Sequence, residues 1–177
     1  MSIHARTITD FLKQHSHRVT HIVVAHTRYK TFECDDKSMP SFVEAAKLDC
    51  RFFRNRFNQM LYGKKAHRKP LQYQSLMLAT LEGALINTDR NLTLHYNFSI
   101  GNLPPNKSDA ELMQTFRTCW CDYAKQREDI WFENVSSNPR RAIDWIGCST
   151  KEATVKGNIA CWDFENTQIP YAAFDAG

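Results

Sequence analysis

Three side chains in the middle of the sequence have the types and the spacing to hold a divalent metal ion. Residues 76–100 contain two apolar runs separated by the polar turn 87–90, which is the pattern of a β-hairpin. A turn centred in that segment places Glu82 opposite His95, and a register shift of two residues places it opposite Asn97 instead. Opposed residues share one face of a sheet, so a carboxylate, an imidazole and an amide converge in either register.

This set of donors favours Mg²⁺ or Mn²⁺, because oxygen ligands and imidazole suit these ions and leave coordination positions open for a substrate phosphate. The second arm of the hairpin supports the geometry, since its apolar and polar residues alternate cleanly from 94 to 100. A simpler interpretation stays open. A strand with one polar face is often half exposed to solvent, and that alone would explain His95 and Asn97.

The elements that must position these residues can be read from the pattern of the whole chain. We expect a leading helix within 1–18, a strand at 19–30, a helix at 41–62, the hairpin at 76–100, a helix at 108–127, a strand at 130–135 and a helix that begins at 138 and ends at Gly157. Capping-box patterns mark two helix starts, at Ser41 with Glu44 and at Ser108 with Glu111.

The resulting order, β-α-β-β-α-β followed by a helix, predicts an α+β fold of the ferredoxin-like, split βαβ type. In that fold the helices 41–62 and 108–127 cover one face of a four-stranded antiparallel sheet. The other face would carry Glu82, His95 and Asn97, and we expect it to be open except where the last helix crosses it.

Length and composition indicate one globular domain, with a core at 19–157, an N-terminal extension at 1–18 and a tail at 158–177. The 177 residues are 42% hydrophobic and 12% aromatic, which is ordinary for a protein with a real core. No apolar run approaches the ~20 residues that cross a bilayer, and the first residues lack the pattern of a signal peptide. We therefore expect no membrane partner and a cytoplasmic location. The six cysteines form no CxxC pair, so free thiols are expected.

Positive charge is concentrated in one segment. Seven basic residues and no acidic residue lie between 51 and 69, so this segment carries +7 in a chain of net charge +4, and the remainder carries −3. The seven are Arg51, Arg54, Arg56, Lys64, Lys65, Arg68 and Lys69. Basic residues near the end of a helix also complement the helix dipole, but one or two charges suffice for that. A surface that contacts a phosphate backbone explains seven charges better, and we expect it to lie beside the face that carries Glu82, His95 and Asn97.

Short motifs on this predicted fold resemble the replication-initiator and relaxase endonucleases of the HUH superfamily. The resemblance spans 19–157 and rests on Leu81-Glu82-Gly83, on Leu94-His95-Tyr96-Asn97 and on Trp145-Ile146-Gly147-Cys148-Ser149-Thr150-Lys151. It implies a divalent metal held by an acidic residue (Glu82) and a His-hydrophobic-His motif, here His95 and Asn97. It also implies a nucleophile on a following helix that attacks single-stranded DNA and stays attached to the 5′ phosphate.

The chain departs from the family pattern at two positions. Asn97 stands where the second motif histidine is expected, although an amide oxygen can still bind Mg²⁺ or Mn²⁺. Cys148 stands where the family has its tyrosine, in a Tyr-x-x-Lys pattern that Lys151 completes, and the spacing i, i+3 would put both on one helix face. The attacking group could be Cys148, another tyrosine such as Tyr171 or Tyr29, or metal-activated water. Cys148 could also be a buried helix cysteine, or nicking could be lost while binding is kept.

Taken together, the sequence predicts a metal-dependent, sequence-selective DNA-nicking endonuclease of replication-initiator type from a mobile element or phage. Its partner would be single-stranded or locally melted DNA. Because the chain has no GxxxxGK[ST] motif, a host replication helicase would have to supply any unwinding. The first alternative is a nicking-deficient DNA-binding module of the same fold. An RNA-binding domain of the same topology is disfavoured, because it would expose aromatic residues on the central strands.

Overall fold

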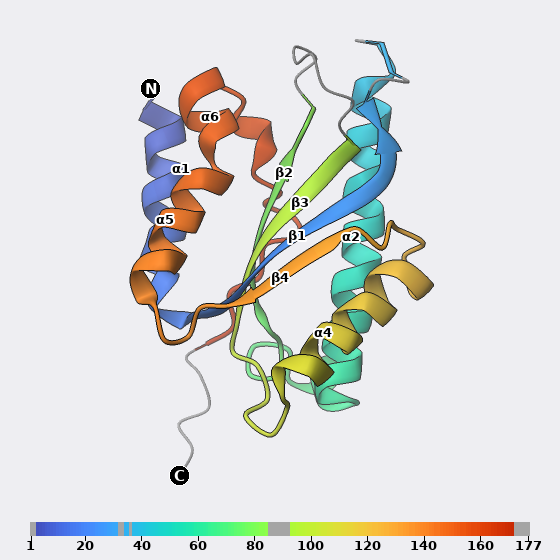
Figure 1. Ribbon diagram of the computed structural model, residues 1–177, viewed down its shortest axis with the longest axis vertical. Helices are drawn as coiled ribbons and strands as arrows, with labels where there is room; N and C mark the ends of the chain where they lie inside the picture. The colour runs from blue at the N-terminus through green and yellow to red at the C-terminus, as the bar shows by residue number, and fades with distance from the viewer. Residues whose placement is uncertain (1–2, 32–33, 36, 85–92, 172–177) are drawn as a thin grey trace.

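A single four-stranded antiparallel sheet organises the α+β architecture of the computed structural model, which describes residues 3–31, 34–35, 37–84 and 93–171 (Figure 1). Its strands are β1 (Val19–Lys30), β2 (Leu76–Glu82), β3 (Thr93–Gly101) and β4 (Ile130–Asn134). Their order across the sheet is β2-β3-β1-β4, so β2 and β3 are neighbours, as the hairpin pattern predicted. The predicted turn at 87–90 lies outside the described residues.

Helices pack against both faces of this sheet. They are α1 (Ile3–Gln14), α2 (Met39–Tyr62), α3 (Lys65–Arg68), α4 (Asp109–Arg117), α5 (Pro139–Ser149) and α6 (Lys151–Lys156), and a π-helix at Thr118–Tyr123 continues α4. In Figure 1, α2 and α4 lie on one side of the sheet, and α1, α5 and α6 lie on the other.

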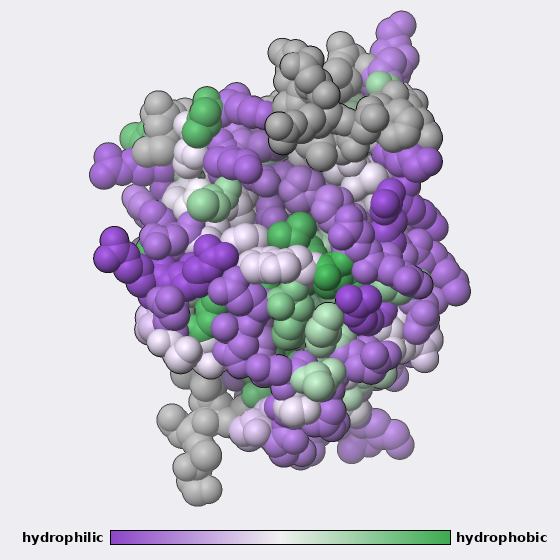
Figure 2. Space-filling view, in the orientation of Figure 1, coloured by the Kyte–Doolittle hydropathy of each residue, from purple (hydrophilic) through white to green (hydrophobic). Residues whose placement is uncertain are grey.

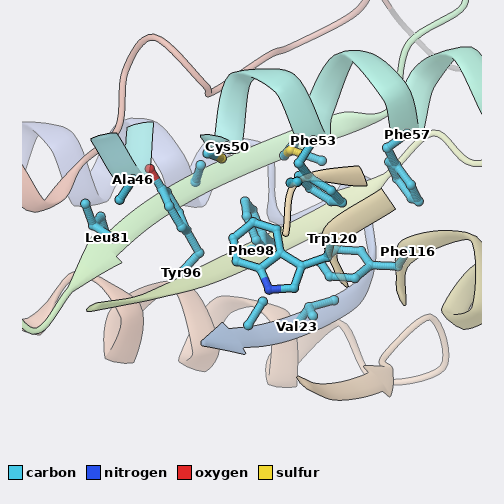
Figure 3. Packing of buried hydrophobic residues seen from close by; sticks show 14 of the residues in the cluster. Val23, Ala46, Cys50, Phe53, Phe57, Leu81, Tyr96, Phe98, Phe116 and Trp120 are labelled. Carbon is cyan, nitrogen blue, oxygen red and sulfur yellow. The ribbon is translucent and has the colours of Figure 1, made fainter. Parts of the chain in front are cut away.

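The larger core lies between the sheet and the α2–α4 side, and we call it the aromatic core because its largest side chains are aromatic (Figure 3). Phe53 of α2 is at its centre. Its ring centroid is 4.7 Å from that of Phe116, 5.1 Å from that of Trp120 and 5.6 Å from those of Phe57 and Phe98. The residues come from α2, β3, α4 and the π-helix, so this cluster ties both helical connections to the central strand.

The second face was expected to be open except where the last helix crosses it. Helix α5 does lie on this face, but α1 covers it as well, and the face has a core of its own. Ile22 of β1 and Leu76 and Leu78 of β2 pack there against Leu12 of α1 and Ile146 of α5. The sequence carried a sign of this. β2 begins with four consecutive apolar residues instead of alternating, and a strand that is apolar on both sides must be covered on both sides.

The C-terminal segment covers the outer edge of β2. Met77 and Gln168 exchange two backbone hydrogen bonds of 2.9 and 2.8 Å, and the Asp163 amide donates to the Ala79 carbonyl at 3.0 Å. An uncovered edge strand exposes unpaired amide and carbonyl groups that can pair with another chain. The tail pairs with groups of this kind on β2.

Several helix boundaries differ from the predictions. Ser41 does not cap a helix, because α2 already begins at Met39 after Ser38 and contains Pro40 in its first turn. Ser108 does cap α4, and both hydrogen bonds of its capping box with Glu111 are present. The last predicted helix is interrupted at Thr150, which lies between α5 and α6.

Among the described residues, no helix is both long enough and apolar enough to cross a membrane.

We predict that Phe53→Ala destabilises the protein far more than Phe52→Ala. Phe53 is fully buried at the centre of the aromatic core, whereas its neighbour Phe52 is 48% exposed. Removing a buried phenyl ring costs about 3–5 kcal/mol through lost burial and the cavity left behind, and removing an exposed ring costs much less. Urea unfolding of the two variants measures the difference, and equal midpoints would contradict this account of the core.

Candidate functional site

Glu82, His95 and Asn97 come together at the end of the β2–β3 hairpin, on the face opposite the aromatic core. Glu82 pairs directly with His95, and Thr80 pairs with Asn97, which is the first of the two predicted registers. Oε2 of Glu82 lies 3.4 Å from Nε2 of His95 and accepts a hydrogen bond of 3.0 Å from Nδ2 of Asn97. The three side chains therefore form one contiguous cluster.

The carboxylate of Glu82 is buried but only half satisfied. The residue is 4% exposed, and its Oε1 atom is buried without a hydrogen-bond partner among the described residues. A buried carboxylate oxygen without a partner is costly, so such an atom indicates a place for a cation or a donor. His95 keeps a partly exposed side chain, which leaves the cluster accessible from solvent.

The donors of this cluster suit a hard divalent cation, with one adjustment. No group of three or more His, Cys, Asp and Glu side chains in the described part of the chain could hold a metal ion, so a site here depends on the Asn97 amide. That amide directs Nδ2 to Glu82, and it must turn over to offer Oδ1 as a ligand. The unpartnered Oε1 of Glu82 needs no such change.

His26 of β1 is a neighbour of the cluster that the sequence analysis missed. Its ring stacks on that of His95 with centroids 5.3 Å apart, and its Nδ1 lies 2.8 Å from Oγ1 of Thr93. Its pKa is lowered, first by burial and then by the neighbouring His95 ring. His26 is at an alternate position of β1 from Ile22, so both side chains point to the face that carries the cluster. Its contact with His95 depends on β1–β3 pairing, which no local pattern specifies.

Two contacts fix the end of β2 beside the cluster. The Gly83 amide donates to Oε1 of Glu152 at 3.0 Å, and Nδ2 of Asn158 donates to Oε2 of the same buried carboxylate at 3.1 Å. Gly83 has a φ of +95°, and a Cβ there would lie 3.0 Å from the Thr93 carbonyl oxygen. A glycine is therefore required after Glu82, and α6 holds that turn in place.

Cys148 and Lys151 do not share one continuous helix. Cys148 lies near the end of α5, and Lys151 is the first residue of α6, after the break at Thr150. Both side chains are exposed, so Cys148 is not the buried helix cysteine that was one alternative. Cys148 follows Trp145 by three residues, so the two are neighbours on the surface of α5, and Trp145 in turn contacts Trp131 of β4.

The two other candidate nucleophiles lie elsewhere. The Tyr29 hydroxyl donates to Oδ2 of Asp49 on α2 at 2.7 Å, and burial raises the pKa of Tyr29. That contact is on the opposite face of the sheet from the cluster. The backbone amide of Tyr171 donates to the Leu71 carbonyl at 2.8 Å, near the start of β2 rather than its end. The structure therefore brings neither tyrosine to Glu82.

The basic segment divides into two parts. Arg51 pairs with the Glu165 carboxylate, Arg54 donates to the Glu165 carbonyl at 2.7 Å, and the guanidinium of Arg56 lies 4.2 Å from the centre of the Tyr123 ring. Three of the seven charges therefore hold the tail and the π-helix. The other four are exposed and form no ion pair with a described acidic side chain; we call Lys64, Lys65, Arg68 and Lys69 the basic lobe.

The basic lobe does not lie beside the metal-ligand candidates, contrary to expectation. It follows the end of α2, on the other face, and precedes the start of β2, whereas Glu82 ends that strand. Seven residues of β-strand span about 20 Å. The charge pattern does not show on which face of the sheet α2 packs. The buried side of α2 faces the aromatic core, so the basic lobe that follows this helix is on the opposite face from the cluster.

Neither a protein-family model nor a curated protein nor a solved structure matches this chain.

We predict that Cys148 reacts with iodoacetamide faster than the five other cysteines. Its side chain is exposed, whereas Cys50, Cys119 and Cys161 are buried. Burial raises the pKa of Cys119 and Cys161 to about 12 and that of Cys50 well above its usual value, so little reactive thiolate forms at neutral pH. Peptide mass spectrometry after brief labelling identifies the site. Labelling of all six at one rate would contradict the folded arrangement.

Proposed function

We propose that the protein is a metal-dependent endonuclease that nicks one DNA strand, of the replication-initiator type. The observation that carries the proposal is the half-satisfied Glu82 carboxylate in contact with His95 and Asn97. A cluster that needed only internal hydrogen bonds would leave no buried carboxylate oxygen without a donor. Oxygen and imidazole donors at a partly exposed position match the ligands of a cation that works on phosphates.

The topology supports the same proposal. The strand order β2-β3-β1-β4, with α2 connecting β1 to β2 and α4 connecting β3 to β4, agrees with a ferredoxin-like split βαβ arrangement. The cluster lies on the central strand β3 and its neighbour β2, which are the positions that the HUH resemblance implies. The additional helices α1, α5 and α6 would then be embellishments that leave the Glu82 end of the sheet face accessible.

Each side chain has a role in this proposal. Glu82, His95 and Asn97 would hold Mg²⁺ or Mn²⁺, which supplies charge to polarise a phosphodiester and stabilise its developing negative charge. Cys148 would attack as the thiolate, so that an S–P bond forms, the P–O3′ bond breaks, and the leaving 3′ oxygen takes up a proton from solvent. Lys151 would attract the phosphate from the start of α6. Because the helix is interrupted at Thr150, Lys151 and Cys148 are not held as a rigid pair.

A nicking-deficient DNA-binding module is the second candidate, and the basic lobe favours it. Lys64, Lys65, Arg68 and Lys69 lie at the far end of β2 from Glu82, so they could bind a phosphate backbone without any chemistry at the cluster. The lobe also borders a cavity of about 360 Å³, lined by residues 68–72 and Tyr171. Both candidates share the partner and differ in whether the strand is cut.

We predict that cleavage of single-stranded DNA needs Mn²⁺ or Mg²⁺ and falls more than about 100-fold in His95→Ala, because losing a metal ligand costs more than losing its supporting contacts. The control is His17→Ala, since His17 is exposed in a 3-10 turn outside the cluster. Gel assays use a pool of labelled oligonucleotides of random sequence. Products run with and without protease reveal a covalent protein adduct, which Cys148→Ala should abolish.

The possible outcomes separate the candidates. Cutting that survives a chelator and His95→Ala would overturn the role of the cluster. Metal-dependent cutting without an adduct, unchanged in Cys148→Ala, would assign the attack to water. Binding without cutting, under all metal conditions, would favour the nicking-deficient module.

We predict that the salt dependence of DNA binding distinguishes the two parts of the basic segment. Removing Arg68 and Lys69 together should reduce the slope of log K against log salt by about 1.4, because each contact with single-stranded phosphate contributes about 0.7. Removing Arg51 and Arg54 together should change the slope little, since the tail already engages both guanidinium groups. Fluorescence anisotropy at several salt concentrations measures both slopes, and equal changes would contradict the division.

A further inference from the structure

An exposed tryptophan, Trp131, and a partly buried one, Trp145, form a pair on the same sheet face as the candidate metal cluster. Val24 of β1 pairs with Asn97 on one side and with Trp131 of β4 on the other, so the three residues form one row across the sheet. Side chains in such a row point to the same face. Asn97 and Trp131 are therefore two strand spacings apart, which is about 10 Å.

The geometry of the pair leaves aromatic surface available. Trp131 is 43% exposed on an edge strand, and its ring centroid is 5.4 Å from that of Trp145 on α5, with an angle of 38° between the planes. The guanidinium of Arg141 lies 5.9 Å from the centre of each ring. Glu133 holds that guanidinium at 3.1 Å, so it is fixed in place beside the rings.

The surroundings of the pair show that it is not ordinary core. Nε1 of Trp145 is buried and lacks a hydrogen-bond partner among the described residues, whereas a settled core tryptophan usually has one. Trp120 provides the comparison within this chain, because its Nε1 donates to the His26 carbonyl at 3.1 Å. Figure 2, which looks toward the β4 edge of the sheet, shows apolar and near-neutral residues gathered in the middle of the view, over β4, with hydrophilic residues around them.

We propose that Trp131, Trp145 and Arg141 form a subsite for an unpaired nucleobase of the DNA strand whose phosphate lies at Glu82, His95 and Asn97. The inference rests on the proposed function and names a part of its substrate site. Stacked nucleotides advance about 3.4 Å each along one strand, so 10 Å separates a phosphate from a base within about three nucleotides. Aromatic rings and guanidinium planes bind every base through its π-face, and that contact tolerates any sequence.

A base fits these contacts better than an apolar peptide or a second copy of the chain. The contact surface consists of the exposed Trp131 ring, tilted against the partly buried Trp145 ring, with the Arg141–Glu133 ion pair beside them. A planar aromatic ligand gains stacking on Trp131 and contact with the Arg141 guanidinium beside it, whereas an aliphatic side chain gains neither. Because Trp131 is about 10 Å from Asn97, a base stacked on it and a phosphate at the cluster can belong to the same DNA strand.

The test compares binding of a labelled twelve-residue oligothymidylate with binding of an abasic strand of the same length, by fluorescence anisotropy with EDTA present. We expect Trp131→Ala to weaken binding of the thymidylate strand about 5- to 100-fold, which corresponds to one stacked base. Trp131→Phe should retain most of the affinity. Neither change should affect the abasic strand, because it has no base to stack.

The matched control is Phe164→Ala, which removes another exposed aromatic ring, 70% exposed, from the tail that covers the opposite edge of the sheet. Unchanged thymidylate affinity in Trp131→Ala would overturn the subsite, as would an equal loss on the abasic strand. A wild-type dimer that Trp131→Ala dissociates, seen by size-exclusion chromatography, would assign the pair to self-association instead.

The design separates this inference from the proposed function. Binding is measured without metal, so it does not depend on cutting. If the protein binds bases through Trp131 but never cuts DNA, the endonuclease proposal is wrong and the subsite stands. If the protein cuts DNA with metal but its thymidylate affinity does not depend on Trp131, the subsite is wrong and the endonuclease proposal stands.

Discussion

The two-residue period of β3 determines what each side of the molecule contains. Its apolar residues, from Leu94 to Ile100, point to the aromatic core, and His95 and Asn97 point to the other face. Because β3 pairs with both β1 and β2, a slip of one residue would reverse every side chain of the central strand at once. The burial of Tyr96 and Phe98 therefore fixes the direction of the two polar side chains that contact Glu82. The candidate site is a consequence of how the core packs.

The tail adds a second constraint, because it joins α2 to the outer edge of β2, which it covers. The Tyr96 hydroxyl donates to Oδ2 of the buried Asp163 at 2.6 Å, and Nδ2 of Asn166 donates to the same atom. Burial raises the pKa of Tyr96 well above its usual value, so the phenol keeps the proton it donates. Arg51 and Arg54 bind Glu165 in the same segment. Part of the positive charge that resembled a DNA surface in the sequence therefore stabilises the fold.

The hairpin could be predicted because its information is local. The polar turn and the alternation of β3 were enough to place Glu82 opposite either His95 or Asn97, on one face in both cases, and the structure has the first of these registers. The start of α4 was equally local, since the capping box joins residues only three positions apart. A local signal was not always sufficient, because the Ser41–Glu44 pattern is just as short and yet α2 begins at Met39, before Ser41.

The features that the sequence did not reveal all depend on distant partners. The contact of His26 with His95 joins residues about seventy positions apart, and the pairing of Arg51 with Glu165 joins residues more than a hundred apart. Neither leaves a pattern in its own neighbourhood. The break at Thr150 is a related case, because its hydroxyl donates to the Ile146 carbonyl one turn back and also accepts a hydrogen bond from Thr9 of α1. Packing against α1 accompanies the interruption, which periodicity alone could not anticipate.

The position of that break changes how the candidate nucleophile should be understood. A tyrosine or cysteine followed by lysine at i+3 works as a unit only if one rigid helix presents both. Here Glu152 of α6 is committed to the Gly83 turn, and α5 contacts the sheet through Trp145. Cys148 is thus positioned by α5 together with the tryptophan pair, and Lys151 is positioned by α6 together with the end of β2. A DNA strand whose base stacks on Trp131 would also meet α5, which carries both Trp145 and Cys148. The placement of the base and the attack by Cys148 would then be coupled through α5. Lys151 would act on the phosphate separately, from α6.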